Sequence, residues 1–281
     1  MAGTPTGEVS GDMSSRRPGS GGVEQPVFHG VVPFTMVDFP GKIALTAYTL
    51  GCNFRCPICH NRQLALSLAD GLPKSGIEAV LEHVRSRRGW IDGVCVTGGE
   101  PLLHKWIKDA LQRFKEEGLA VKLDTNGCFP DRLEECLSAG CVDYVAMDVK
   151  APLTEAEYSK SAGVAMARWL PKLRKSMDII KSSGVNYEFR TICVPGVHTP
   201  ESIGEIAREI SPCRRYVLRA FRPMNTLDPA YERVPPPTAE EMSACFAAAR
   251  EHMEEVHMDE AAADAGGSPF ADGAAPAPAG M

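Results

Sequence analysis

The stretch Ile43–Asn61, IALTAYTLGCNFRCPICHN, decides how the rest of the chain is interpreted. It begins as a near-continuous apolar run, which is typical of a strand buried on both faces of a parallel sheet. Gly51 ends the run, and three cysteines follow on one tight loop, at Cys52, Cys56 and Cys59. The C-x3-C-x2-C spacing therefore places three thiols at the carboxyl end of a buried strand.

The number of cysteines in this loop is informative. A thiolate-coordinated 4Fe–4S cluster normally takes four cysteine ligands. A cluster held by three leaves one iron with an open coordination site, where a substrate or cofactor can bind. Two alternatives stay open: a structural zinc site with His60 as the fourth ligand, and three unrelated thiols, since free cysteine behaves as a small hydrophobe.

Length and composition limit the class of protein. A chain of 281 residues can hold one large domain or two small ones, and an apolar fraction of 44% is ordinary for a globular protein. No window approaches the ~18 consecutive apolar residues of a membrane span, and the N-terminus lacks the apolar segment of a secretory signal. Ten cysteines without an export signal indicate a reducing compartment, so we predict a cytoplasmic protein.

Both ends of the chain differ in composition from its middle. Residues 1–26 and 259–281 are rich in small residues and proline and have no apolar periodicity, which predicts disordered tails. Between them we predict a core domain over residues 27–235 and a C-terminal helix over residues 236–258. The negative net charge lies mostly in the C-terminal segment, and no basic face for nucleic acid is evident.

Strands and helices alternate through the predicted core. Strands are expected over Ile43–Leu50, Gly93–Thr97, Ala120–Asp124, Val142–Met147, Tyr187–Val194 and Tyr216–Phe221, and helices over Ser75–Arg88, Leu103–Glu117, Pro130–Ser138, Trp169–Ser182, Pro200–Ile210 and Thr238–His257. About six βα units indicate a parallel sheet covered by helices, with too few strands for a closed eight-stranded barrel. We therefore predict an α/β fold, a partial (β/α)6 barrel of the TIM type with a mostly parallel sheet.

Polar residues follow the second predicted strand at its carboxyl end, where α/β proteins gather their ligands. Gly98 and Gly99 allow the backbone to approach a ligand closely, and the Glu100 carboxylate can accept a hydrogen bond from an ammonium group. A plain turn with an exposed glutamate is the alternative.

Charged and amide side chains follow the next two strands. Asp124 and Asn126 come at the end of the third strand, and Asp148 and Lys150 come at the end of the fourth. We expect them to share one rim, although an Asx-turn and a solvated charge pair stay open as alternatives. Arg190 lies within the fifth strand, where a buried guanidinium needs an acidic partner such as Asp148 or a bound carboxylate.

The remaining cysteines and one histidine carry weaker signals. No second C-x2-C pair exists, so buried thiols are the expectation for Cys95, Cys128, Cys136, Cys141, Cys193, Cys213 and Cys245. A second cluster on Cys128, Cys136 and Cys141 is an open alternative. His198 stands alone, and we expect a surface role for it rather than a functional one.

Several motifs together resemble a known family. The segment VDFPGK at residues 37–42 directly precedes the first strand, and it is followed along the chain by GCNFRCPICHN, TGGEP, KLDTNG, YVAMDVKAP, YEFRT and FRP. This combination resembles the radical S-adenosylmethionine superfamily, and within it the anaerobic ribonucleoside-triphosphate reductase activating proteins, which are related to the pyruvate formate-lyase activating enzymes. The resemblance covers about Gly30 to Val234.

The resemblance implies two cofactors. A 4Fe–4S cluster would be held by Cys52, Cys56 and Cys59, and its open iron would chelate the amino and carboxylate groups of S-adenosylmethionine. The segment from Gly98 to Glu100 would bind the amino group of this cofactor. The rim formed by Asp124, Asn126, Asp148, Lys150 and Arg190 would orient its ribose or carboxylate.

The resemblance also implies an activity and partners. Electron transfer from the reduced cluster would break a carbon–sulfur bond of S-adenosylmethionine and give methionine and a 5′-deoxyadenosyl radical. That radical would take a hydrogen atom from a glycine of a glycyl radical enzyme, with a flavodoxin or ferredoxin-type protein as electron donor. The alternatives are a radical enzyme acting on a small molecule, such as a deazaguanine-forming synthase, an activase of another glycyl radical enzyme, and a zinc-binding scaffold without redox role.

Overall fold

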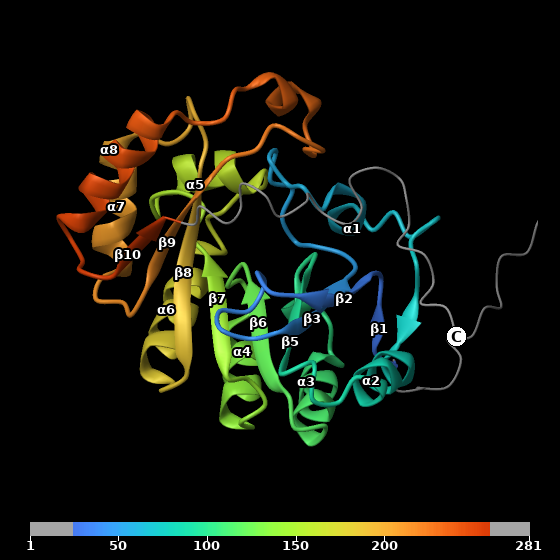
Figure 1. Cartoon of the computed structure of the whole chain (residues 1–281). Helices are drawn as coiled ribbons and strands as arrows, with labels where there is room; N and C mark the ends of the chain where they lie inside the picture. Colours follow the sequence, from blue (N-terminus) through green and yellow to red (C-terminus); the bar gives the residue numbers. More distant parts are fainter. Residues whose placement is uncertain (1–24, 259–281) are drawn as a thin grey trace, which may run out of the picture.

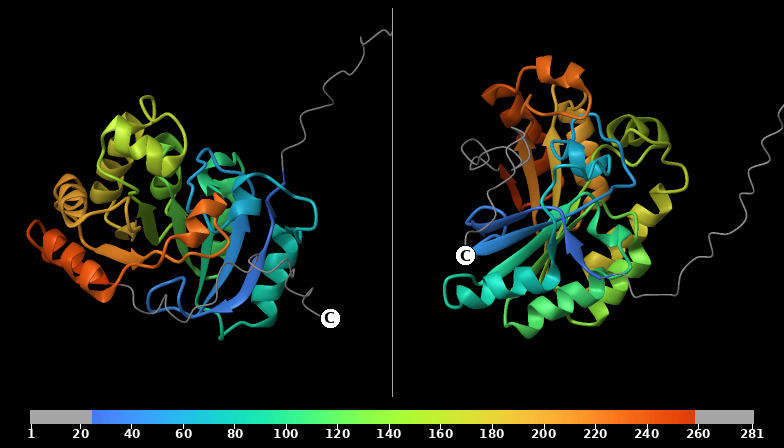
Figure 2. Two further views of the ribbon diagram at one scale, coloured as in Figure 1. Left: turned by 90° about the horizontal axis from the view of Figure 1, so that it is seen from above. Right: turned by 90° about the vertical axis from the view of Figure 1, so that its right-hand side faces the viewer.

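The computed structural model describes residues 25–258. The tails predicted to be disordered, 1–26 and 259–281, lie outside the described residues except for 25 and 26. An eight-stranded sheet dominates the described part, with the strand order β10-β9-β8-β7-β6-β5-β3-β2 (Figure 1). Seen from above, the strands follow an arc and the helices lie around its outer side (Figure 2).

The six predicted strands and their parallel pairing are confirmed. The parallel strands are β3 (Ala44–Thr49), β5 (Gly93–Gly98), β6 (Ala120–Thr125), β7 (Tyr144–Asp148), β8 (Asn186–Cys193) and β9 (Tyr216–Ala220). The covering helices are α2 (Ile77–Ser86), α3 (Ile107–Glu116), α4 (Pro130–Ser138), α6 (Leu170–Ser182), α7 (Pro200–Ile210) and α8 (Ala239–Arg250). The molecule is thus the partial α/β barrel that the sequence predicts.

The two edge strands of the sheet differ in direction. β2 (Val31–Thr35) pairs with β3 in the antiparallel sense, and β10 (Val256–Met258) pairs with β9 in the parallel sense. The helix predicted over residues 236–258 is therefore wrong in its second half, because α8 ends at Arg250. The buried residues of α8 end at Ala249, whereas Val256 is buried in the sheet beside Tyr216.

Several short elements of the structure were not predicted from the sequence. They are α1 (Arg62–Ala65), α5 (Glu155–Ala162), the 3-10 turns η1 (Pro101–Leu103) and η2 (Pro229–Arg233), and a small sheet of β1 (Val27–Phe28) and β4 (Ser75–Gly76). Only Tyr158 and Ala162 of α5 are buried, so its apolar periodicity is weak. Its start nevertheless carries the T-x-x-E pattern typical of a helix N-terminus. In the structure the Thr154 hydroxyl caps the helix by accepting a hydrogen bond from the Glu157 amide.

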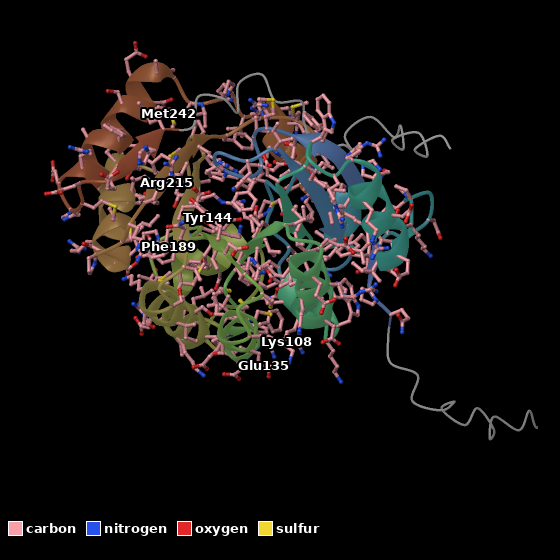
Figure 3. The ribbon with its side chains drawn as sticks, turned by 60° about the horizontal axis from the view of Figure 1, so that its bottom comes forward. Lys108, Glu135, Tyr144, Phe189, Arg215 and Met242 are labelled. Atoms are coloured by element: carbon pink, nitrogen blue, oxygen red, sulfur yellow. The ribbon has the colours of Figure 1, made fainter. Side chains whose placement is uncertain are left out.

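Burial on both faces explains the strand sequences. Every residue of β3 is buried, because helices cover the outer face of the sheet while the inner face closes on the barrel interior. Seen from below, Lys108 on α3 and Glu135 on α4 lie on the outer layer, whereas Tyr144 and Phe189 lie on the sheet (Figure 3). No helix in residues 25–258 combines the length and apolar character needed to span a membrane.

Candidate functional site

A large cavity lies at the carboxyl ends of the parallel strands. Its volume is about 1040 Å³. All the site residues predicted from the sequence line it: Cys52, Cys56, Cys59, Gly98, Gly99, Glu100, Asp124, Asn126, Asp148, Lys150 and Arg190. The fold therefore brings together side chains that are separated by up to 138 positions in the chain, and their roles toward a ligand stay predictions.

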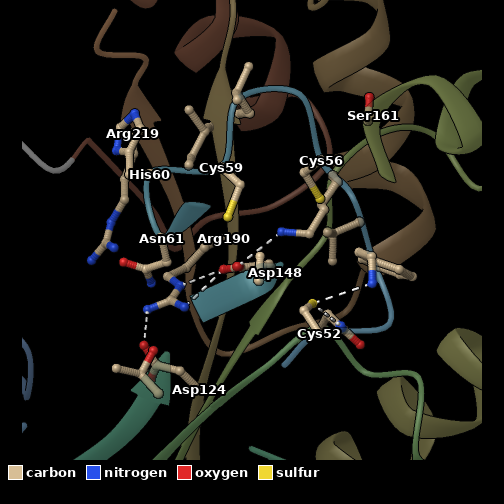
Figure 4. A pocket seen from close by; sticks show the side chains of 18 of the residues that line it. Cys52, Cys56, Cys59, His60, Asn61, Asp124, Asp148, Ser161, Arg190 and Arg219 are labelled. Carbon is tan, nitrogen blue, oxygen red and sulfur yellow. Dashed lines mark hydrogen bonds and ion pairs between the residues drawn. The ribbon is translucent and has the colours of Figure 1, made fainter. Parts of the chain in front are cut away.

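The three cysteines of the loop after β3 face this cavity (Figure 4). All three are free thiols. The Phe54 amide donates a hydrogen bond to Cys52 Sγ (3.3 Å), and Asn126 Nδ2 lies 3.8 Å from the same sulfur. Burial raises the pKa of Cys52 to about 12 and that of Cys56 to about 11, and it also raises the pKa of Cys59. A bound cation would supply the charge needed to ionise such thiols.

The donor set fits an iron–sulfur cluster better than a single metal ion. Among the described residues, no three His, Cys, Asp or Glu side chains converge as ligands of one metal ion would. A zinc site needs that convergence, and His60 is occupied elsewhere, with Nε2 3.0 Å from the Arg222 carbonyl oxygen. The ligands of a cluster bind different irons, so they need only surround a common space, as these three cysteines do. The zinc alternative is not supported.

The alternative of a second cluster is not supported either. Cys128, Cys136 and Cys141 all belong to the hydrophobic core. The Cys141 thiol donates a hydrogen bond to the Cys136 carbonyl oxygen at 3.1 Å. These are the buried thiols that the sequence favoured.

The α5 helix holds one side of the cysteine loop. The Arg55 amide donates a hydrogen bond to the Ala162 carbonyl oxygen (2.8 Å), and the rings of Phe54 and Tyr158 meet edge to face with centroids 6.5 Å apart. Gly163 ends α5 in the left-handed region (φ +67°), and a Cβ there would collide with the Arg55 carbonyl. Only glycine satisfies both conditions at this position.

The segment after β9 holds the other side of the loop. The Asp228 amide donates to the Pro57 carbonyl oxygen (2.9 Å), and Asn225 Nδ2 donates to the His60 carbonyl oxygen (3.3 Å). The contact of His60 with Arg222 adds a third link. The loop is therefore fixed from two sides by protein contacts alone.

The two glycines at the carboxyl end of β5, Gly98 and Gly99, have a structural explanation. Gly98 has φ +114°, and a Cβ on Gly98 or Gly99 would collide with the backbone of Thr49 or Gly51, respectively. The Gly99 amide donates to the Thr49 carbonyl oxygen and the Glu100 amide to the Gly51 carbonyl oxygen, both at 2.8 Å. The glycines therefore allow the backbone at the end of β5 to pack directly against the backbone at the end of β3, which leads into the cysteine loop.

Glu100 is tied to the protein through both carboxylate oxygens. Oε1 accepts hydrogen bonds from the Leu102 amide (3.1 Å) and the Thr125 hydroxyl (2.7 Å), and Oε2 accepts one from the Asn126 amide (2.7 Å). Burial raises the pKa of this carboxyl to about 7 against the opposing effect of these bonds. Glu100 therefore positions Asn126, whose side chain contacts Cys52 and donates to Asn53 Oδ1 (2.8 Å).

Alternating charges cross the floor of the cavity. Arg190 donates through Nη1 to Asp124 Oδ2 and through Nε to Asp148 Oδ1, both at 2.9 Å, which confirms the expected pairing with Asp148. Lys150 Nζ donates to the other oxygen of Asp148 at 3.2 Å, and Lys122 Nζ pairs with Asp124 Oδ1. The pair of Asp148 and Lys150 is thus one end of a connected network and not an isolated solvated pair.

The network sets the charge of its members. Burial opposes ionisation of Asp148, but the Arg190 and Lys150 cations outweigh burial and lower its pKa. The same balance, with Arg190 and Lys122 as cations, lowers the pKa of Asp124. Lys122 was missed from the sequence, although its spacing of two from Asp124 on one strand places both side chains on the same face.

His198 is not a free surface side chain, because both nitrogens of its ring are bonded to the backbone. Its Nδ1 accepts a hydrogen bond from the Val194 amide (3.1 Å), so its Nε2 carries the proton and donates to the Lys150 carbonyl oxygen (3.0 Å). Burial lowers the pKa of this ring. The histidine joins the exits of β7 and β8 and lines the cavity.

Comparisons with known proteins agree with this geometry. Residues 46–210 match the family model of the radical SAM superfamily. A "Putative glycyl-radical enzyme activating enzyme" of Methanocaldococcus jannaschii is 30% identical over 228 residues, which cover 81% of this chain and 93% of that protein. The pyruvate formate-lyase 1-activating enzyme of Escherichia coli is 27% identical over 186 residues, covering 62% of this chain and 72% of that enzyme.

A solved structure supports the fold. A radical SAM methyltransferase from Sphaerobacter thermophilus superposes with a TM-score of 0.60 at 14% identity, over 80% of this chain and 68% of that chain. Membership of this family implies S-adenosylmethionine and an iron–sulfur cluster, and the three free cysteines around the cavity provide ligands for the latter. The chain belongs to the radical SAM superfamily and is a relative of the glycyl-radical enzyme activating enzymes.

Proposed function

We propose that this protein is a radical S-adenosylmethionine activase that forms a glycyl radical on a partner enzyme, and that the partner is anaerobic ribonucleoside-triphosphate reductase. The single observation that carries the proposal is the convergence of the three cysteines and the charged strand exits on one cavity. The relatives named as activating enzymes support the reaction type. The choice of reductase rests on the motif combination around Asp38, Cys52 and Asp148.

The cysteine loop would hold a 4Fe–4S cluster through Cys52, Cys56 and Cys59. When bound, this cluster and S-adenosylmethionine supply one-electron reductive cleavage of the cofactor. The contacts of the loop with α5 and with the segment after β9 support its role as a fixed platform for the cluster. The Asn126 side chain lies close enough to Cys52 to direct an N–H toward its sulfur.

The charged floor would orient S-adenosylmethionine. Lys150 directs one N–H at Asp148 and keeps others for a carboxylate, and its ammonium is partly accessible from the cavity. Asp124 and Asp148 stay ionised beside Arg190 and can accept hydrogen bonds from ribose hydroxyls. The remaining acceptor capacity of Glu100 Oε2 suits the amino group of the cofactor.

The cavity lining favours a protein substrate over a small charged one. Phe34, Val37 and Val197 line the cavity while keeping more than a third of their surface exposed. Such side chains can pack against a peptide segment that presents a glycine. A flavodoxin or ferredoxin-type donor and a cytoplasmic location belong to the same proposal.

Anaerobic reconstitution with iron and sulfide tests the function. The reconstituted protein, given dithionite and S-adenosylmethionine, should form 5′-deoxyadenosine, and addition of the reductase should give the electron paramagnetic resonance doublet of a glycyl radical. Cleavage without a radical on the reductase would reject this partner. Absence of cleavage with a full complement of cluster would reject the activity itself.

A further inference from the structure

A group of aromatic and cationic side chains lies at the amino-terminal ends of α4 and α6. Trp169 is covered by two cations, with the Arg168 guanidinium carbon 4.7 Å and the Lys172 ammonium nitrogen 4.8 Å from its ring centre. Phe129 meets Trp169 edge to face at 5.9 Å, and the Arg132 guanidinium stands over Phe129 at 5.6 Å. We call these five residues the basic aromatic patch.

The patch is accessible and lies apart from the cavity. Arg168 and Lys172 are exposed, while the two rings are half-buried against the core. None of its five residues lines the cavity. Ligands in the cavity therefore leave this surface free.

A short chain of contacts links the patch to Cys52. Phe129 follows Cys128 directly, the Cys128 amide donates a hydrogen bond to Asn126 Oδ1 (3.0 Å), and Asn126 Nδ2 lies 3.8 Å from Cys52 Sγ. From the other direction, exposed Arg55 donates to the carbonyl oxygens of Cys52 and Phe54, both at 2.7 Å. Arg55 in turn is tied to α5, which leads through Gly163 into the turn that carries Arg168.

Cations predominate in the patch. It contributes three of them, Arg132, Arg168 and Lys172, and the neighbouring Asp131 carboxylate is paired with Lys175 (2.6 Å). Complementary charge guides the encounter of two proteins, and its effect is largest on association rates at low salt. Rigid aromatic rings with flanking cations are typical of protein interfaces.

We propose that the basic aromatic patch is the docking site of a small acidic protein that donates single electrons to the cluster behind Cys52. This inference rests on the proposed function, which requires a reduced cluster. In the step concerned, a reduced flavin or iron–sulfur centre of the donor loses one electron and the cluster gains it. No bond is made or broken and no proton is moved.

Charge reversal tests the proposal with a matched control. The variant Arg168→Glu/Lys172→Glu and the control Arg87→Glu/Arg208→Glu change the net charge equally. The control residues are exposed, Arg87 at the C-cap of α2 and Arg208 on α7, and neither belongs to the patch. Binding of an acidic flavodoxin with oxidised flavin is measured by calorimetry at low and high salt. We expect the patch variant to bind about 10-fold more weakly or worse at low salt, with the control close to wild type.

A second measurement separates docking from chemistry. Reduction of the reconstituted cluster by reduced flavodoxin should slow by a similar factor in the patch variant, whereas cleavage of S-adenosylmethionine driven by dithionite should be unchanged. The neutral variant Arg168→Gln/Lys172→Gln should show a smaller loss of binding, and it remains informative if the charge-reversed chain folds poorly.

Three results would overturn the proposal: unchanged flavodoxin binding, an equal loss in the control, or a loss of radical transfer to the reductase under dithionite. The last result would assign the surface to the glycyl radical enzyme. Failure of the wild type to cleave S-adenosylmethionine with dithionite would instead reject the proposed function, since the calorimetric binding measurement does not depend on cleavage.

Discussion

Charged residues at the two ends of the sheet are of the same types but are held differently. At the carboxyl ends of the strands, Arg190 has 8% of its side chain exposed and bridges two carboxylates. At the amino ends, Lys115 pairs with Asp143 at 2.8 Å, with 31% and 41% of their side chains exposed. Water can replace either partner of the second pair. At the first, removing one partner leaves a buried charge, so the Arg190 network presents its charges to a ligand in a fixed arrangement.

The largest contrast between the two ends is expected for cysteine substitutions. Cys56→Ala should abolish cluster binding while the fold persists, because the loop is held by contacts that do not involve its sulfur. Cys213→Ala, at the amino end of β9, should leave the iron and sulfide content of the reconstituted protein unchanged. A full complement of iron in the first variant, or a loss in the second, would contradict the ligand assignment.

The next contrast concerns stability. Arg190→Met leaves Asp124 and Asp148 without their shared cation, so we expect the free energy of unfolding to fall by about 3–5 kcal/mol. Lys115→Met at the opposite end should cost less than ~1 kcal/mol. Urea denaturation monitored by circular dichroism measures both. Similar losses in the two variants would mean that burial does not distinguish the two ends.

A smaller effect is expected on cofactor affinity. Asp148→Asn should keep the cluster and weaken binding of S-adenosylmethionine by on the order of 1–3 kcal/mol, roughly ten- to a hundredfold, as for a lost charge-assisted hydrogen bond. Asp143→Asn is the control. Affinity is measured on reconstituted protein after the iron content has been checked. An affinity within about twofold of wild type for Asp148→Asn would remove this carboxylate from the cofactor site.

The smallest effect is a pH dependence located at the carboxyl end. Burial lowers the pKa of His198, so below about pH 6.5 the unfolded chain binds a proton there before the folded chain does. Stability from this group is complete above that pH and decreases as the pH falls toward the folded pKa. The decrease in unfolding free energy between about pH 8 and pH 5.5 should be smaller in His198→Gln. Equal decreases in variant and wild type would show that another group is responsible.

The sequence predicted the features that depend on local pattern. The apolar run at Ile43–Leu50, the cysteine spacing and the polar residues at strand ends all follow from chain periodicity, and parallel strands necessarily bring their carboxyl ends together. The final helix was extended too far because residues 251–255, EHMEE, favour helix and include no glycine or proline to end it. Only the pairing of Val256 with Tyr216 distinguishes β10 from a further turn of this helix.

Features that depend on distant contacts could not be predicted. The sequence identifies Glu100 as an acceptor, but nothing local shows that Thr125 and Asn126 satisfy its oxygens. Gly163 shows no motif, because its requirement for glycine comes from the carbonyl of Arg55, more than a hundred positions earlier. The contacts of His198 could not be predicted because its partners are backbone groups, and the pattern of side chains in a sequence does not indicate such partners.

The two-sided support of the cysteine loop has a consequence for maturation. Since hydrogen bonds to α5 and to the segment after β9 hold the loop, we expect little chain entropy to be lost when the cluster binds. A cluster preassembled on a carrier can therefore be handed to a finished polypeptide rather than nucleating its folding. Hydrogen exchange of the Arg55 amide, bonded to Ala162, should then be equally slow in iron-free and reconstituted protein, and faster exchange without iron would show that metal orders the loop.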